Sequence, residues 1–238
     1  MAWAFVQDDG AVVDDATSAT TIAKAFTSNV TAGNHIYVWC GWSNSDTNPT
    51  VADSLGNTYA LLGARVFDAT NSQGMAQFHA ENITGGACTV TVTFGASVPY
   101  RRIGIIEHSG IATASSTDGT PTGQVVATPG TGTDGASSGN ITVAANSLVI
   151  GAYQNINEAS PGSPTITQGT GYTARELSGV GIGRMEDKNG SAGATAATFT
   201  LSSSQRSIVM VAAFKEPAAG GGIAIPIITR QFRARWAA

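Results

Sequence analysis

The chain has 238 residues and a formal net charge of −4, and only 12% of its residues are charged. Hydrophobic residues make up 42% of the chain, and glycine occurs 29 times. This profile excludes a coiled coil and highly charged disorder, and it favours an all-β protein rich in glycine, threonine and serine.

Bulk features also bear on where the protein works. No apolar run approaches the roughly 18 residues that would span a bilayer, and the start MAWAFVQDDG lacks the basic and apolar regions of an export signal. Cys40 and Cys88 are too few for a disulfide framework, so we expect both to be reduced core residues, with a Cys40–Cys88 disulfide as the alternative. We therefore expect neither a membrane association nor Sec-type export.

Residues 1–28 contain strand-like segments around two acidic turns, Asp8–Asp9 and Asp14–Asp15. Two aspartate pairs could hold calcium, which takes several oxygen ligands. No EF-hand spacing accompanies them, so we expect solvated turns and no metal site.

The stretch 34–44, NHIYVWCGWSN, predicts a strand that is at least partly covered on both faces. Alternate residues of a strand point to opposite sides of the sheet. One side carries Ile36, Val38, Cys40 and Trp42, and the other carries Tyr37, Trp39 and Gly41. We expect Trp42 in the core, and Tyr37 and Trp39 on a surface that either stacks on a glycan or packs against another subunit.

The segment Asp53–Asn57, DSLGN, predicts the tight turn of a hairpin. Residues 74–81 and 82–94 predict a second strand pair, and TVTVTF within it alternates apolar and polar residues most regularly. Residues 101–109 close this half of the chain.

The organising strand returns as NSLVIGAYQN at residues 146–155. An offset of 112 aligns Asn34 with Asn146, an offset of 107 aligns residues 82–94 with 189–201, and an offset of 105 aligns residues 102–107 with 207–212. We interpret the two stretches, about 26–111 and 140–216, as pseudo-repeats of about four strands each. The Gly/Ser/Thr-rich stretch 112–139 joins them, with one possible short strand at 124–128. Residues 1–216 thus predict a two-sheet, jelly-roll-like antiparallel β-sandwich in which each repeat buries its apolar face against the other.

The sequence changes character after Glu216. Residues 217–222 predict a flexible linker, and residues 223–238 an extended C-terminal anchoring arm. The arm residues expected to contact a partner are Ile225, Ile227, Ile228, Arg230, Phe232, Arg233, Arg235 and Trp236. Three arginines are too few for nucleic-acid binding beside an acidic body, so we expect the arm to dock on a protein.

Motifs that would carry chemistry are missing from the sequence. It has no GxxxxGK[ST], GxGxxG, GxSxG or HExxH pattern, and His35, His79 and His108 occur singly. Glu107 and His108 are neighbours, so in a strand they would face opposite sides. We therefore expect no catalytic residues and no cofactor, and we predict that the protein is not an enzyme.

Four segments resemble a β-sandwich family that occurs in phage and prophage structural proteins and in bacterial surface proteins. They are Gly33–Asn34 before the strand, the hairpin Asp53–Tyr59, the strand Gly85–Val92, and the closing Glu107–Gly110. Tyr59 stands where tryptophan is frequent in that family. The resemblance implies a structural or adhesive role without catalytic residues.

On this basis the predicted function is that of a virion protein, made in the host cytoplasm. The first choice is a capsid decoration protein whose arm docks on a neighbouring copy or on the major capsid protein, and which forms a homo-oligomer, with a trimer favoured by analogy. The alternative is a carbohydrate-binding or adhesive module of a phage tail fibre or bacterial surface protein.

Overall fold

The computed structural model describes residues 2–8, 13–127, 132–156, 164–177 and 182–218. The predicted all-β architecture is confirmed: every pair of strands is antiparallel, and the sheets pack face to face. No helix occurs among the described residues, and hence none that could cross a membrane.

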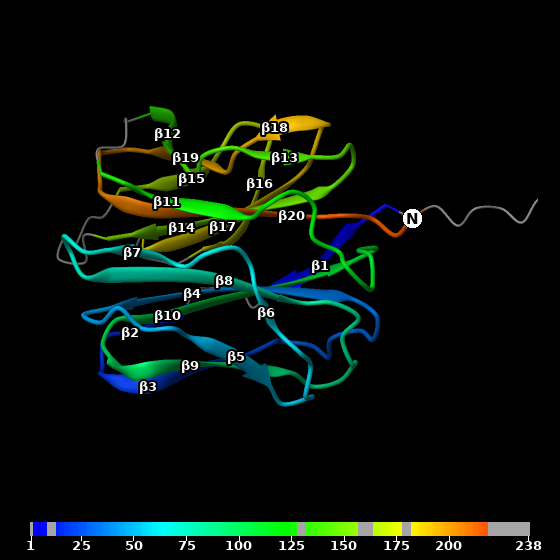
Figure 1. The fold of residues 1–238 in the computed structure, drawn as a ribbon, viewed down its shortest axis with the longest axis horizontal. Coiled ribbons are helices and arrows are strands. Elements are labelled where there is room, and N and C mark those ends of the chain that lie inside the picture. The colour runs from blue at the N-terminus through cyan, green and yellow to red at the C-terminus, as the bar shows by residue number, and fades with distance from the viewer. Residues whose placement is uncertain (1, 9–12, 128–131, 157–163, 178–181, 219–238) are drawn as a thin grey trace, which may run out of the picture.

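The sheets stack as four layers, two from each half of the chain (Figure 1). The outer sheet of the first half has the order β3-β9-β5, and its inner sheet has the order β1-β10-β4-β8-β6, with β2 on β10 and β7 on β8. These strands are β1 (Ala4–Asp8), β2 (Val13–Asp15), β3 (Ala19–Ala25), β4 (His35–Ser43), β5 (Thr50–Asp53), β6 (Ala60–Leu61), β7 (Val66–Asp68), β8 (Gln73–Ala80), β9 (Thr89–Val98) and β10 (Arg101–Ser109).

The inner sheet of the second half has the order β11-β20-β14-β17-β16, and its outer layer consists of the sheets β12-β19-β15 and β13-β18. Their bounds are β11 (Thr122–Val126), β12 (Gly132–Ser137), β13 (Ile141–Val143), β14 (Leu148–Asn155), β15 (Ile166–Gln168), β16 (Thr173–Leu177), β17 (Gly183–Asn189), β18 (Gly193–Thr195), β19 (Thr198–Leu201) and β20 (Ser207–Phe214). The stretch between the repeats thus contains two strands, β11 and β12, where the sequence suggested one.

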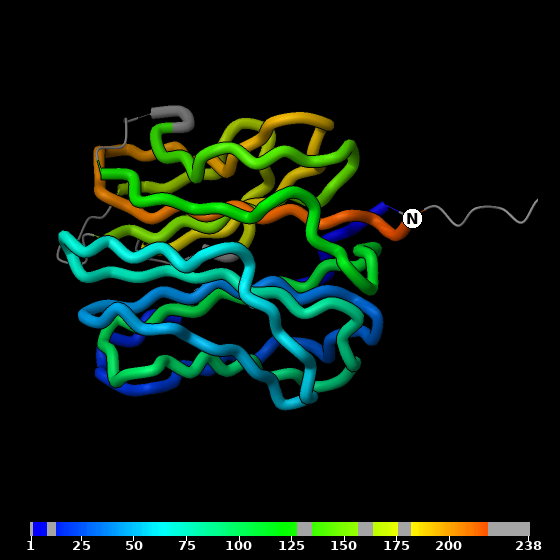
Figure 2. The backbone as a smooth tube through the Cα atoms, viewed as in Figure 1, coloured from blue at the N-terminus to red at the C-terminus, as the bar shows by residue number. Residues whose placement is uncertain are grey.

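The two halves pair their strands in the same order. In the first, β4 lies between β10 and β8; in the second, β14 lies between β20 and β17. The central outer strands β9 and β19 are each flanked by one earlier strand on either side. Figure 2 shows the first half in blue to green below and the second in green to orange above, so each half folds largely from one continuous piece of chain.

Side-chain alternation explains why each half is a sandwich of its own. On β9, Val90, Val92 and Phe94 are buried while the threonines between them are not. They pack against Ile36, Val38, Cys40 and Trp42 of β4, as the alternation predicted. The layered architecture therefore adds an internal core to each repeat, besides the contact between repeats that the sequence suggested.

The sequence alignment of the repeats assigns the wrong face to two strands. The offset of 112 places Ile36 and Val38 over Leu148 and Ile150, but Ile36 and Val38 lie in the core of the first half, whereas Leu148 and Ile150 face the other half. The offset of 105 fails similarly, since Ile103 lies in that core and Ile208 faces the other half. A shift of one residue exchanges the two faces of a strand.

The predicted hairpin turn is organised by the Asp53 carboxylate. It accepts hydrogen bonds from the Leu55 amide at 2.9 Å, from the Asn57 amide at 3.0 Å and side chain at 2.8 Å, and from the Tyr59 hydroxyl at 2.9 Å. These bonds satisfy an Asx-type turn. Both cysteines are free and buried, as predicted.

The second acidic pair lies in β2 and keeps solvent exposure, with 44% of the Asp15 side chain and 23% of the Asp14 side chain accessible, but it also pairs with arginines. Asp15 accepts from Arg101 Nη2 at 2.5 Å, and Asp14 from Arg102 Nε at 3.1 Å. Arg102 itself is fully buried. The aspartates therefore serve as partners for arginines that β10 carries into the protein, and the described residues form no cluster of three or more metal-ligating side chains.

Candidate functional site

The two inner sheets pack against each other in an internal interface that we call the seam. Its apolar residues come from β4, β8 and β10 on one side and from β14, β17 and β20 on the other. Several polar side chains are buried in or beside it. They include His35, His79, His108 and Asp187, which makes the seam one of two candidate locations for a functional site; the other is the end where the chain leaves β20.

Tyr37 and Trp39, the predicted glycan or subunit contacts, lie inside the seam with no exposed surface. A Cβ atom added to Gly183 on β17 would stand 2.6 Å from Cη2 of the Trp39 indole, so the ring lies directly against the second half. The Tyr37 hydroxyl donates to Gln77 at 3.0 Å. The prediction that these aromatics meet a glycan or another subunit is therefore wrong, because the second half of the same chain covers them.

His35 and His79 form a buried pair at one end of the seam. Nε2 of His35 and Nδ1 of His79 are 3.3 Å apart, and the ring of Phe214 lies 4.2 Å from the His35 ring and 5.3 Å from the His79 ring, between centroids. Burial lowers the pKa of both imidazoles, and the neighbouring imidazole lowers the pKa of His35 further. Both rings are therefore neutral near pH 7.

His108 reaches the second half through Asp187. His108 Nε2 lies 2.9 Å from Asp187 Oδ2, and Arg175 Nε donates to the same oxygen at 2.7 Å. Burial lowers the pKa of His108 even though Asp187 opposes the shift. Burial raises the pKa of Asp187, but hydrogen bonds from His108 and Arg175 outweigh it and leave that pKa below its usual value.

The His108–Asp187 pair has the residue types of an acid–base dyad but not its setting. Both side chains are buried, with exposed fractions of 0% and 1%. Within the described part of the chain, His108 Nδ1 has no hydrogen-bond partner, so no nucleophile is positioned against it. Glu107, the adjacent residue, points to the opposite side and accepts from Asn34 Nδ2 at 2.6 Å, as strand alternation predicted. The arrangement fastens the two halves together.

A further ion pair closes the seam near β7. Arg206 binds Asp68 with two hydrogen bonds, Nε to Oδ2 at 2.6 Å and Nη2 to Oδ1 at 2.7 Å. This bidentate bond lowers the pKa of Asp68 to about 2. Gln77 Nε2 also donates across the seam to the Val211 carbonyl at 3.1 Å. The halves are thus joined by polar contacts as well as by apolar packing.

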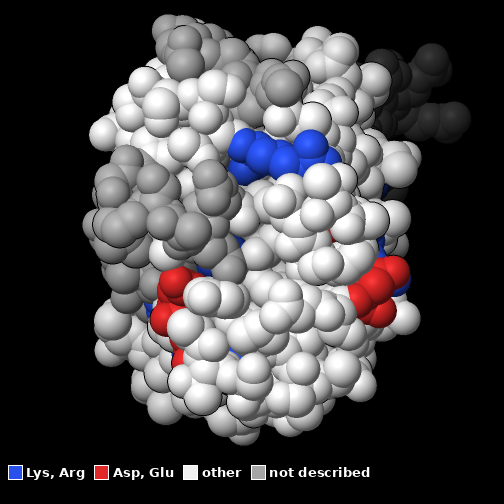
Figure 3. Space-filling model, turned by 90° about the vertical axis from the view of Figure 1, so that its left-hand side faces the viewer, with Lys and Arg blue, Asp and Glu red and all other residues white. Residues whose placement is uncertain are grey.

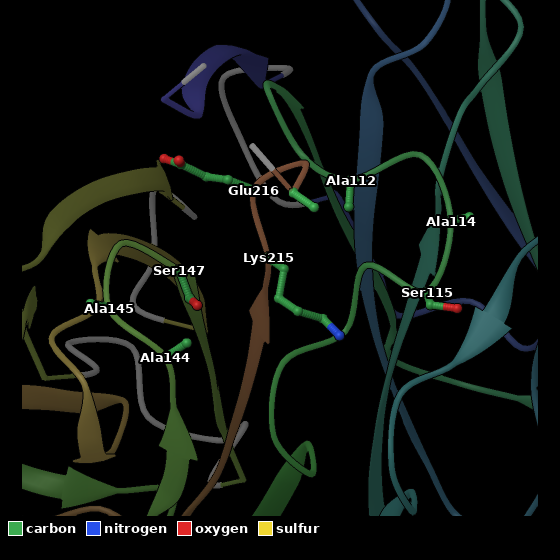
Figure 4. Close-up of a pocket in the computed structure, with 9 residues that line it drawn as sticks. Ala112, Ala114, Ser115, Ala144, Ala145, Ser147, Lys215 and Glu216 are labelled. Carbon is green, nitrogen blue, oxygen red and sulfur yellow. The ribbon is translucent and has the colours of Figure 1, made fainter. Parts of the chain in front are cut away.

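The second place of interest is the end of the molecule where β20 stops and the arm begins. There the chain is bound to the segment after β10: the Lys215 amide donates to the Ser116 carbonyl at 2.6 Å, and the Ala112 amide donates to the Lys215 carbonyl at 2.8 Å. A recess of about 400 Å³ lies beside it, which we call the alanine recess. One wall consists of Ala112, Ala114 and Ser115, and the other of Ala144, Ala145 and Ser147 (Figure 4). Lys215, Glu216 and Ala218 complete the lining.

Two carboxylates hold the walls of the alanine recess. Glu81 accepts from the backbone amides of Ser115 at 3.0 Å and Ser116 at 2.9 Å. Asp118 accepts from the Ala144 amide at 2.7 Å and from the Ser147 hydroxyl. Each wall of the recess is therefore held by hydrogen bonds to one carboxylate, the first wall by Glu81 and the second by Asp118.

A second recess, of about 440 Å³, adjoins the first and shares Glu216 with it. Here the two ends of the described chain meet: the Trp3 amide donates to Glu216 Oε1 at 3.3 Å, and the Trp3 indole donates to Asn189 Oδ1 at 3.2 Å. Asn146 and Ala2 complete its lining. The chain that leads toward the arm is therefore bonded to the segment after β10 at Lys215 and to the N-terminal segment at Glu216.

The opposite end of the molecule is less distinctive. Figure 3 shows the face on the left of Figure 1, where the charged side chains in view are few and form separate patches. No extended basic surface is visible on the described part of that face. The eight arm residues predicted as partner contacts lie outside the described residues: Ile225, Ile227, Ile228, Arg230, Phe232, Arg233, Arg235 and Trp236.

Sequence reasoning did not find the alanine recess, because small residues in two turns carry no motif. It also missed the His108–Asp187 pair, since the partners are 79 residues apart. In comparisons with protein-family models, curated proteins and solved structures, no match to this chain was found.

Proposed function

We propose that the protein is a non-enzymatic structural component of a larger assembly, with a phage virion as the assembly and capsid decoration as the role. The observation that carries the proposal is the division of the chain into a body whose halves are joined by buried hydrogen bonds and ion pairs, and a C-terminal arm whose sequence is apolar and basic. The body supplies a rigid block, and the arm supplies the means of attachment. The motif resemblance described above supports the virion as the setting.

The arm has the composition of an anchor. It carries large apolar side chains together with Arg230, Arg233 and Arg235, and no acidic residue follows Glu216. Apolar side chains that enter pockets supply most of the affinity of such contacts, and charged neighbours supply specificity. We therefore propose that the arm binds a neighbouring copy or the major capsid protein, and that the protein works as a homo-oligomer, with a trimer as the first choice.

Truncation tests this function. A variant that ends at Pro217 should keep the far-ultraviolet circular dichroism of the full chain and still unfold cooperatively, because the last strand, β20, ends at Phe214 and the bonds of Lys215 to Ser116 and of Glu216 to Trp3 are retained. It should no longer bind particles that lack the protein. A full-length variant with Arg230, Arg233 and Arg235 changed to glutamine keeps the apolar residues and serves as the matched control, with intermediate binding. Binding of the truncated protein equal to that of the full chain would refute the anchoring role.

Copy number tests the setting. Quantitative mass spectrometry of purified particles should give a ratio to the major capsid protein that corresponds to many copies per particle. A handful of copies would contradict decoration and assign the protein to a tail or fibre. The glycan-binding alternative is not supported by its proposed contacts, because Tyr37 and Trp39 are buried.

A further inference from the structure

We propose that residues 223–228 of the arm dock into the alanine recess of their own chain, so that the arm is held against the body before it meets a partner. The recess is a built feature: its two walls are fixed by hydrogen bonds to Glu81 and Asp118. Its lining side chains are mostly methyl groups, which leave room for a larger apolar side chain. The arm segment supplies such side chains in Ile223, Ile225, Ile227 and Ile228.

The length of chain between the recess and the arm favours this occupant. Ala218 lines the recess, and only residues 219–222 separate it from Ile223. The five Cα–Cα steps from Ala218 to Ile223 span at most about 18 Å, so Ile223 lies within that distance of Ala218. Residues 220–222 are glycines, which permit a sharp reversal of direction. A short connection gives a tethered segment an effective concentration of the order of millimolar, well above that of a second copy in dilute solution.

Charge favours the same occupant. Glu81 and Asp118 border the recess and Glu216 lines it, whereas Lys215 is the single basic residue in its lining. Arg230 lies two residues beyond the proposed docked segment, and no acidic residue follows Glu216. A basic segment beside an acidic border is attracted to it, most strongly at low ionic strength.

Self-docking would cover the apolar side chains of the arm in the free protein. A segment with four isoleucines in six residues is a site for unspecific association if it stays exposed. The alanine recess would cover it in the free protein, and a partner with a better site would then compete for it. The inference does not depend on the virion role, since a self-docked arm can be released to any partner.

Limited trypsin digestion tests the proposal on the full chain. The bond after Arg230 borders the docked segment, and a protease must bind several extended residues on both sides of a bond to cut it. In Ala144→Phe the new side chain occupies the recess, so cleavage after Arg230 should be about tenfold faster than in the wild type, as expected when a protected segment opens. Ala69→Phe changes another exposed alanine, far from the recess in the sequence, and should leave the rate unchanged. Mass spectrometry identifies the cleaved bond.

Two further measurements complete the design. Ile225→Asp with Ile227→Asp leaves the body untouched and should also speed cleavage, so a misfolded Ala144→Phe variant does not decide the outcome. Equal rates in the wild type and both variants would overturn the proposal. Digestion at protein concentrations about 100-fold apart separates tethered from intermolecular docking: protection that grows with concentration would overturn self-docking and assign the recess to a neighbour's arm. Failed particle binding after truncation, with no protection in the free protein, would leave the proposed function standing without this inference.

Discussion

Replacing Gly183 with alanine should destabilise the protein through one contact across the seam. The added Cβ would lie 2.6 Å from Cη2 and 2.7 Å from Cζ2 of the Trp39 indole, well inside the roughly 3.5–4.0 Å at which carbon atoms attract each other. Trp39 is completely buried, so its indole can move only against other buried side chains of the seam. Over-packing of this kind costs about 1–3 kcal/mol. Gly183 has no left-handed backbone conformation, so the substitution adds no backbone strain of that origin.

Removing the indole should abolish that cost. Trp39→Ala alone should lower the free energy of unfolding by about 3–5 kcal/mol, the range for truncating a buried large aromatic residue. In that background the methyl group that Gly183→Ala adds meets no indole, and its next neighbour is the Tyr153 carbonyl oxygen at an ordinary 3.5 Å. The second substitution should then cost about zero, so the two changes should be coupled by roughly 1–3 kcal/mol.

The assay is urea unfolding of the wild type, both single variants and the double variant, followed by far-ultraviolet circular dichroism. Equal slopes of the free energy against urea would show that the four proteins unfold between comparable states. A second probe, tryptophan fluorescence, checks that the transition is two-state. If the two costs add within about 0.5 kcal/mol, Gly183 does not accommodate Trp39, and the account of the seam is refuted.

Three other predictions concern protonation, thiols and the hairpin. Burial lowers the pKa of the three histidines below 6.5, so as the pH falls the unfolded chain binds protons before the folded chain does. The free energy of unfolding should therefore decrease as the pH drops through about 6.5. Equal urea midpoints at about pH 7.5 and 5.5 would contradict this prediction. The cysteines are buried, and burial raises the pKa of the Cys88 thiol to about 12, so neither should react with Ellman's reagent until urea unfolds the chain; rapid labelling of the native protein would be inconsistent with the structure. Asp53→Ala removes four hydrogen bonds from the hairpin and should lower the free energy of unfolding by about 2–4 kcal/mol. Asp46→Ala, the control at an exposed ion pair, should lower it by less than about 1 kcal/mol. Similar melting temperatures for the two variants would contradict the role of Asp53 in the turn.

Much of the fold could be predicted because β9 alternates apolar and polar residues, which fixes one face inward. The strand β4 does not alternate, because Tyr37 and Trp39 are as apolar as their neighbours, and this pattern predicted that both of its faces are at least partly covered. The lack of alternation also left the register between β4 and β14 undetermined by the sequence. When both faces of a strand are apolar, a match shifted by one residue still aligns apolar with apolar, so the comparison of β4 with β14 could not tell the core from the seam.

The candidate site was less accessible to sequence reasoning. The alanine recess is formed by turns at residues 112–115 and 144–147 and by the chain after β20, which meet only in the folded protein. Alanine and serine in a turn predict nothing about a ligand. The arm was recognisable because its isoleucines and arginines contrast with the linker before it, but the surface that could receive it was not.

The first half is synthesised before the second, so its side of the seam is complete before the second half can cover it. The sheet of β1, β10, β4, β8 and β6 is complete at residue 109, but β20, which covers part of it, ends only at residue 214. At about 5–20 residues per second, synthesis of the intervening chain takes roughly 5–20 s. During that interval Trp39, Met75 and Ile106 have no cover from the second half. Newly made first halves on neighbouring ribosomes would therefore compete with the second half for the same surface, so the yield of folded protein should depend on how densely the messenger is translated.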